Sequence, residues 1–232
     1  MMNATSPPWS ETAYRIDLPH PVPDDLPGPT AELFGWVWRT TLTEPGFALV
    51  RFSGPVGSRD LRRVLFQLVE ALPVRFTPER LGRFDQQVSS RFHRDGAPAA
   101  SLLLLGYEAS TVRSRLFVAD AHRAAVEAGL GIREYLAAFN PMVPVGEARL
   151  GPHATELAVP HGESYVVAIN NSLMPLEPAN PLGVLHKAVI VTPDLAARRV
   201  INSVGLMLAD DTTTTPKDAA AVEHFLTRDD LD

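Results

Sequence analysis

The sequence predicts an α+β protein whose core is an antiparallel β sandwich or barrel with helices packed against it. Three observations lead to this prediction. The best amphipathic helix pattern lies in the first third of the chain, short β-type runs bounded by Pro, Gly or Asn dominate the rest, and no repeat of fixed period is present. With 232 residues, of which 45% are hydrophobic, the chain is long enough to bury one sizeable core.

Composition excludes several classes of function. The chain contains no Cys, which rules out disulfides, thiolate metal sites and cysteine nucleophiles, so a bound metal must have nitrogen or oxygen ligands. The net charge of −6 argues against nucleic-acid binding, because phosphate contacts need a basic surface. No apolar run approaches about 18 residues, and residues 1–8 lack the pattern of a signal peptide. We therefore expect a cytoplasmic protein that binds neither nucleic acid nor membranes.

The beginning of the chain predicts an arm, a helix and a strand. Residues 1–29 are rich in proline, which removes backbone donors and favours an extended arm over the surface. Thr30 is then expected to cap a helix over 31–41, which carries an apolar stripe. Residues 47–52 form an apolar run between two glycines and predict a strand.

The strongest helix pattern covers residues 58–72. Ser58 is expected to cap this helix and Pro73 to end it. Its apolar residues recur with helical spacing at Leu61, Val64, Leu65, Leu68, Val69 and Leu72. The pattern predicts an amphipathic helix that packs on the core.

From about residue 84 the pattern changes to short strands. Strands are predicted over 87–93, 101–108, 115–118, 164–170, 184–191 and 199–208. One helical stretch, 120–139, lies between them and is expected to be interrupted at Gly129 and Gly131. A final helix is expected over 216–227 after a threonine-rich linker. The predicted organisation is an arm over 1–29, a single domain over 30–208, and a linker with a C-terminal helix over 209–232.

His93 and Asp95 are the first candidate metal ligands. Because residues i and i+2 of a strand point to the same face, they can present an imidazole nitrogen and a carboxylate oxygen to one ion. A second pair of this kind, His161 and Glu163, shows that the spacing alone is a weak signal. With seven His and 27 acidic residues, about one such pair is expected by chance. The position of a third ligand must therefore decide which of the two pairs belongs to a metal site.

His186 is the predicted third ligand because it lies within an apolar strand pattern, where an unpaired imidazole is costly to bury. It follows His93 by 93 residues, which leaves room for the intervening strands of a barrel, but it follows His161 by only 25 residues. His93, Asp95 and His186 therefore form the predicted site. A three-histidine site of His153, His161 and His186 is the alternative.

These ligands, together with an arginine about a dozen residues after the distal histidine, resemble the iron(II)/2-oxoglutarate-dependent oxygenases. In that superfamily a His-x-Asp pair, a distal His and such an Arg line one end of a double-stranded β-helix. The resemblance covers roughly residues 44–208 and implies a jelly-roll, cupin-like barrel flanked by helices. It also implies Fe(II) bound by His93, Asp95 and His186, with 2-oxoglutarate and O₂ as cosubstrates.

The resemblance gives the arginine a role in binding 2-oxoglutarate, because a planar guanidinium can hold a carboxylate in a bidentate pair. Arg198 and Arg199 would point to opposite faces of a strand, so only one can serve. Arg199 is preferred because small or apolar residues share its face, but neither arginine is followed two residues later by the serine common in the superfamily. Tyr107 is either a hydroxyl donor to the cosubstrate or a core tyrosine with a polar tip.

The resemblance implies a hydroxylase that decarboxylates 2-oxoglutarate to succinate and CO₂. The bond oxidised would be an unactivated C–H bond of a small-molecule or amino-acid-like substrate. Related halogenases lack the carboxylate ligand and Asp95 is present, so hydroxylation is favoured, with desaturation or ring closure as further outcomes. Asn170 and Asn171, at a strand end, would either orient substrate or form a turn. The alternative from another class is a non-catalytic, cupin-like protein that binds a metal or a ligand.

Overall fold

The computed structural model describes residues 9, 13–23, 26–194, 196–209 and 219–232. Within these residues nine strands form two sheets, and six α-helices accompany them. The predicted α+β class is therefore confirmed. The described strands do not close into a barrel. No helix in the described part of the chain is both long enough and apolar enough to cross a membrane.

The larger sheet has the strand order β1-β2-β7-β4-β9-β3. Its strands are β1 (Arg15–Leu18), β2 (Phe47–Phe52), β7 (Tyr165–Asn170), β4 (Ser101–Tyr107), β9 (Val200–Leu208) and β3 (Phe76–Asp85). All neighbours are antiparallel except β1 and β2, which pair in parallel. The smaller sheet has the order β6-β5-β8 and is antiparallel throughout. Its strands are β6 (Ala154–Leu157), β5 (Arg113–Ala119) and β8 (Leu185–Thr192).

The central strands of the larger sheet are covered on both faces, which explains their continuous apolar runs. Along β4, Leu102 and Leu104 belong to the core shared with the helices, whereas Leu103 and Leu105 belong to the core shared with the smaller sheet. This alternation follows from the two-residue period of a strand. The space between the sheets is therefore lined by side chains from both of them.

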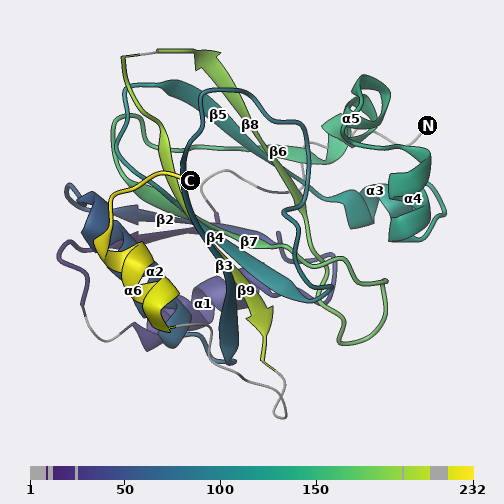
Figure 1. Cartoon of the computed structure of the whole chain (residues 1–232). Coiled ribbons are helices and arrows are strands. Elements are labelled where there is room, and N and C mark those ends of the chain that lie inside the picture. The colour runs from purple at the N-terminus through teal and green to yellow at the C-terminus, as the bar shows by residue number, and fades with distance from the viewer. Residues whose placement is uncertain (1–8, 10–12, 24–25, 195, 210–218) are drawn as a thin grey trace.

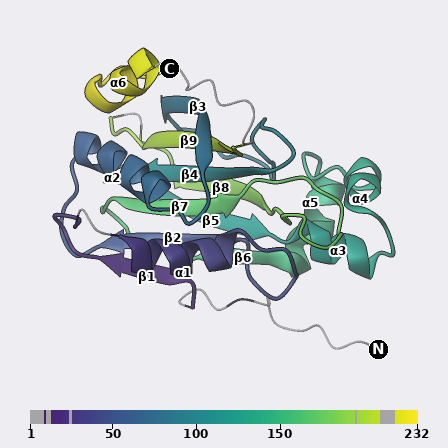
Figure 2. The same cartoon turned by 90° about the horizontal axis from the view of Figure 1, so that it is seen from below.

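Helices cover the outer face of the larger sheet and one end of the molecule. The outer face carries α1 (Pro27–Val37), α2 (Ser58–Glu70) and α6 (Ala219–Thr227). Figures 1 and 2 show the other three helices grouped at one end, away from that face: α3 (Ala121–Glu127), α4 (Ile132–Ala138) and α5 (Pro144–Leu150). Their apolar residues pack against Phe92, Ala119 and Leu185, next to the start of β8.

Two helix starts differ from the prediction. Helix α1 begins at Pro27 and ends at Val37, because proline fits the first turn, where backbone N–H groups have no intrahelical acceptor. Thr30 is therefore not a cap, and its buried hydroxyl donates to the carbonyl of Leu26 (2.6 Å). Helix α2 has Gly57 rather than Ser58 at its N-cap position, since the Ser58 hydroxyl turns away to bond another side chain. The predicted capping roles of Thr30 and Ser58 are wrong.

The predicted interruption of the helical stretch 120–139 is confirmed, because α3 and α4 are two separate helices. Gly129 has a positive φ of 69° and separates α3 from α4. The predicted strand over 87–93 is also not a regular strand, since only His93 forms a β-bridge with β8. The hydroxyls of Ser89 and Ser90 instead accept N–H groups of β8, which interrupts the backbone ladder. Strands β1, inside the predicted arm, β3 and β6 were not predicted. The predicted linker over 212–215 lies outside the described residues.

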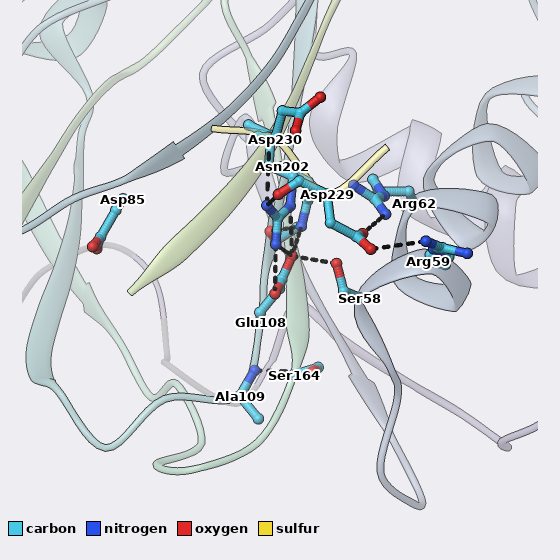
Figure 3. A network of polar contacts seen from close by, with 12 residues as sticks. Ser58, Arg59, Arg62, Asp85, Glu108, Ala109, Ser164, Asn202, Asp229 and Asp230 are labelled. Atoms are coloured by element: carbon cyan, nitrogen blue, oxygen red, sulfur yellow. Dashed lines mark hydrogen bonds and ion pairs between the residues drawn. The ribbon is translucent and has the colours of Figure 1, made fainter. Parts of the chain in front are cut away.

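A polar network attaches the end of the chain to the larger sheet and to α2. Figure 3 shows Asp229 directed at Arg59 and Arg62, and Glu108 directed at Ser58. The side chain of Arg62 is fully buried and also donates to the carbonyl of Arg228 (2.6 Å). The hydrogen bonds from Arg59 and Arg62 lower the pKa of the Asp229 carboxyl to about 2. The carboxylate of Asp229 is therefore ionised across the physiological pH range, and its ion pairs with Arg59 and Arg62 of α2 persist there.

A buried ion pair joins the end of α1 to the start of α3. The guanidinium of Arg39 donates two hydrogen bonds of 2.7 Å to the carboxylate of Asp120, and both side chains are almost completely buried. Asp120 also caps α3 by accepting the N–H of Arg123 (3.0 Å). Arg39 reaches further to the carbonyl of Leu182 (2.9 Å), just before β8. The pair therefore links three segments that meet beside β8.

We expect the variant Asp120→Asn to lower the free energy of unfolding by about 3–5 kcal/mol, because it leaves the buried charge of Arg39 without a counter-ion. Urea unfolding followed by circular dichroism measures this change. The matched control is Asp60→Asn, which removes the exposed partner of Arg63 and should cost less than about 1 kcal/mol. Equal stability of the two variants would contradict the role given to the buried pair.

Candidate metal centre

Two backbone hydrogen bonds bring His93 and His186 together. The N–H of each histidine donates to the carbonyl of the other, and both hydrogen bonds are 3.0 Å long. Residues paired in this way place their side chains on the same side of the ladder. The two imidazole rings lie 4.3 Å apart between centroids. A separation of 93 residues in the sequence thus becomes a direct contact.

Asp95 lies beside the two imidazoles because the side chain of Arg94, which stands between His93 and Asp95, points to the opposite side. The Arg94 side chain donates to the carbonyls of Asn171 (2.6 Å) and Pro98 (2.5 Å), which ties the loop after His93 to the end of β7. This arrangement leaves Asp95 on the side of the two imidazoles. The i, i+2 relation predicted from the sequence therefore holds, although the segment is not a regular strand.

The three side chains form a compact group of potential ligands. The Oδ1 atom of Asp95 lies 3.4 Å from Nε2 of His93 and 3.8 Å from Nε2 of His186. All three ligand atoms lie within 4.8 Å of one another. Ligands about 2.1 Å from one ion at right angles are about 3 Å apart, so a small contraction would bring these atoms to bonding distance.

Protonation states favour metal binding. Burial, assisted by the neighbouring His93, lowers the pKa of His186 to about 4, so its imidazole is neutral at pH 7. The hydrogen bond to Asp95 raises the pKa of His93. Burial opposes ionisation of Asp95, but the two histidines outweigh it and hold the pKa of that carboxyl below its usual value. The centre therefore offers a carboxylate and at least one neutral imidazole.

A hydrogen bond at the far side of the His93 ring shows which of its nitrogens faces the metal position. The Nδ1 atom of His93 lies 2.7 Å from the carbonyl of Arg91 and must donate to it, which leaves the Nε2 lone pair for a metal. In the described part of the chain, Nδ1 of His186 has no partner although it is buried. Two nitrogen ligands and one carboxylate fit Fe(II) and other divalent transition metals.

The ligands face a cavity between the two sheets. This cavity has a volume of about 100 Å³ and is lined by all three ligands, by Tyr107 and Gln86, and by apolar residues of both sheets. The apolar residues include Leu105, Leu116, Val167, Ile169 and Ile201. The metal position is thus at the boundary between a polar cluster and a largely apolar chamber, as is typical of small-molecule sites.

The structure distinguishes the two candidate arginines. Arg198 is exposed, whereas Arg199 is buried, with Nε donating to Ser114 (2.9 Å) and another nitrogen to Gln86. Its guanidinium lies 4.8 Å from the ring centre of Tyr107. No described residue accepts a hydrogen bond from its remaining nitrogen. Arg199 therefore lies behind Gln86 and Tyr107, which line the cavity, and it lines a neighbouring cavity on the other side of Tyr107.

Tyr107 is a core residue that also faces the cavity. Its ring stacks on Tyr165 with 4.6 Å between centroids, and the side chain is buried. Burial raises the pKa of its hydroxyl, an effect that Arg199 opposes. The hydroxyl is therefore a neutral hydrogen-bond donor at all ordinary pH values.

The three-histidine alternative is wrong. Among the described residues, His93, Asp95 and His186 are the only cluster of three potential metal ligands. His153 instead lies 3.6 Å from the carboxylate of Glu127, and His161 lines a different cavity. Both residues follow the helical insertion between β5 and β6, which holds them away from β8.

Two polar residues of the cavity were not predicted. Gln86 lines the cavity and accepts a hydrogen bond from Arg199. Lys187 lies over the rings of Phe92 and Phe117 and donates to Glu147 of α5 (2.9 Å). Nothing in the local sequence marks either residue, because their positions depend on pairing between distant segments.

In comparisons by sequence, the chain matches no family model and none of the curated proteins.

We expect His186→Ala to weaken binding of Fe(II) under anaerobic conditions by more than ~100-fold, because one of three ligands is lost from a buried position. Isothermal titration with Fe(II), and with Co(II) as a stable substitute, measures the affinity. His161→Ala removes the exposed histidine of the other His-x-acid pair and should bind as the wild type does. An unchanged affinity in the correctly folded His186→Ala protein would contradict this centre.

Proposed function

We propose that this protein is an Fe(II)- and 2-oxoglutarate-dependent oxygenase. The observation that carries the proposal is the convergence of His93, Asp95 and His186 at a cavity between two sheets. Three ligands on one side of an ion leave about three coordination positions for a 2-oxo acid and O₂. A buried arginine next to the same cavity supplies the cation that a dicarboxylate needs.

The strand order supports a double-stranded β-helix as the underlying fold. From β4 onward the chain alternates between the sheets: β4 lies in the larger, β5 and β6 in the smaller, β7 in the larger, β8 in the smaller and β9 in the larger. The segment before β4 also contributes to both, with β3 beside β9 and His93 beside β8. Such winding of antiparallel strands between two facing sheets is typical of jelly rolls.

Each residue of the centre has a distinct task in this proposal. His93, Asp95 and His186 would hold Fe(II), which with bound 2-oxoglutarate supplies the activation of O₂. The hydrogen bond from His93 to the carbonyl of Arg91 fixes the ring so that Nε2 faces the ion. Apolar residues form much of the cavity wall, so a substrate bound there would displace water from the reactive centre.

Arg199 would bind the far carboxylate of 2-oxoglutarate. Its support comes from three features: a buried guanidinium, a nitrogen with no partner among the described residues, and contacts with Gln86 and Tyr107 at the cavity wall. Tyr107 adds a neutral hydroxyl donor to the same wall. A fixed cation and a fixed donor would orient the cosubstrate so that its 2-oxo acid end faces the metal.

The proposed reaction is hydroxylation of a small-molecule substrate. One 2-oxoglutarate and one O₂ are consumed for each substrate, and the products are the hydroxylated substrate, succinate and CO₂. The presence of Asp95 as a third protein ligand favours hydroxylation over halogenation, because a halide would need that position.

The test of the proposal is binding and turnover of 2-oxoglutarate. Protein loaded anaerobically with Fe(II) should bind 2-oxoglutarate, and admission of O₂ should yield succinate, measured by mass spectrometry. The Asp95→Ala variant should do neither at the wild-type level. Tight metal binding without any affinity for 2-oxoglutarate would contradict the oxygenase and favour a cupin-like binding protein.

Arg199→Ala should raise the apparent KM for 2-oxoglutarate by ~10–10³-fold, equivalent to roughly 1.5–4 kcal/mol for a lost charge-assisted pair in a desolvated pocket. Initial rates of succinate release at varied 2-oxoglutarate measure this. The matched control, Arg198→Ala, changes the neighbouring exposed arginine and should leave KM unchanged. Affinity for Fe(II) should stay near wild type in both variants. Loss of activity only in Arg198→Ala would contradict the assignment.

A further inference from the structure

A second cavity lies on the inner face of the larger sheet, beside the metal centre. It has a volume of about 390 Å³ and occupies the end where β3, β9 and β4 meet. The inner face has small residues there, since Gly82, Ser203 and Gly205 line this cavity. Larger residues at the paired positions farther along, Phe84 and Ile201, fill the corresponding space. The cavity is therefore a consequence of small residues on two neighbouring strands.

The second cavity adjoins the first one at the metal centre. Asp95 and Phe84 line both cavities. A metal bound to Asp95 would thus have the chamber with Tyr107 and Gln86 on one side and the larger cavity on the other. The proposed oxygenase needs two such compartments, one for the cosubstrate and one for the substrate.

Asn171 lines the second cavity and has a buried acceptor atom. The residue is almost completely buried, and within the described residues its Oδ1 atom has no hydrogen-bond partner. Its Nδ2 atom donates to the carbonyl of Asp95 (3.2 Å), which can only accept, so the orientation of the amide is determined. A buried acceptor without a partner costs free energy, and a ligand N–H or O–H would remove that cost.

Arg80 presents a cation at the same cavity. Its side chain is exposed and donates to the carbonyl of Gly96 (3.1 Å), the residue that follows Asp95. Because Asn171 and Arg80 bond consecutive carbonyls of one loop, their polar groups lie within reach of one small ligand. Both groups flank the loop that carries a metal ligand.

The other residues that line the second cavity indicate which further chemical groups a ligand would carry. Phe84 and Leu103 offer apolar surface. The carboxylate of Asp232 also lines the cavity, where its Oδ2 accepts the N–H of Arg83 (2.8 Å). A nearby carboxylate favours a cationic amino group over a hydroxyl as the donor to Asn171.

We propose that the second cavity is the substrate site and that it binds an aliphatic amino acid, with the carboxylate on Arg80 and the amino group on Oδ1 of Asn171. As the site of a substrate, this inference rests on the proposed oxygenase function. The amino-acid site itself is independent of 2-oxoglutarate, since none of the residues proposed to bind the amino acid contacts Arg199 in the structure. In this arrangement the side chain of the amino acid lies along the apolar wall that leads to Asp95.

The test compares three ligands that differ by one group. L-Leucine has both the carboxylate and the amino group, L-leucinamide lacks the carboxylate, and 4-methylpentanoate lacks the amino group. Ligand-observed NMR titration of the zinc-loaded protein measures their affinities. L-Leucine should bind at least ~10-fold more tightly than either analogue, because each analogue loses one of two charge-assisted contacts. Equal binding of all three, or binding of none, would overturn the proposal.

Replacement of Arg80 tests whether its guanidinium binds the carboxylate of L-leucine. Arg80→Gln should weaken L-leucine binding at least ~10-fold and leave L-leucinamide binding unchanged, because only the former uses the guanidinium. Arg75→Gln is the matched control, since Arg75 is an exposed arginine outside the cavity. Arg80 is itself exposed, so its replacement should not disturb folding. Equal loss of both ligands in Arg80→Gln would contradict the proposed contact.

A parallel titration with 2-oxoglutarate separates this proposal from the proposed function. L-Leucine binding that persists while Fe(II)-loaded protein fails to bind 2-oxoglutarate would overturn the oxygenase and leave the amino-acid site intact. Binding of 2-oxoglutarate without binding of L-leucine would overturn the amino-acid site alone. Added L-leucine should also increase succinate release at least ~10-fold in the wild type and much less in Arg80→Gln.

Discussion

The backbone bridge between His93 and His186 is the constraint on which the candidate centre depends. Because each histidine donates its N–H to the carbonyl of the other, both imidazoles lie on one side of the ladder. A shift of the pairing by one residue would turn one ring to the opposite face and abolish the centre. The register of β8 against β5 is therefore as important to the site as the ligands themselves, since β5 holds β8 from its other side.

Several interactions away from the ligands maintain that register. Arg39 binds the carbonyl of Leu182 while paired with Asp120, so the loop that enters β8 is anchored to two helices by buried side chains. Gly183 passes so close to the backbone of Ser172 that a Cβ atom would clash with it, at 2.1 Å from the carbonyl oxygen. Electrostatics and close packing thus act on the same short segment, three residues before a metal ligand.

The metal centre needs a neutral imidazole and an ionised carboxylate in the same place. Burial keeps His186 neutral, whereas neighbouring histidines keep Asp95 ionised, and both states are those that a divalent metal requires. Buried polar atoms without partners are rare in native proteins, yet one occurs on His186, one on Arg199 and one on Asn171. The first belongs to the metal centre and the others lie beside the two adjoining cavities. Such atoms also occur elsewhere among the described residues, for example on Arg62 and Thr155, so the proposed sites depend on the cavities beside these groups.

Local pattern was sufficient for most of the elements and for the ligand types, but not for strands β1, β3 and β6 or for which segments meet. The apolar runs of β2, β4 and β7 and the periodicity of α2 are set by neighbouring residues, so they were predictable. The chemistry and spacing of His93, Asp95 and His186 likewise indicated a metal site. The folded chain alone decided that Arg199 is buried and Arg198 exposed, and that Asn171 faces a second cavity. Those outcomes depend on strand register and on packing between segments far apart in sequence, which no local pattern encodes.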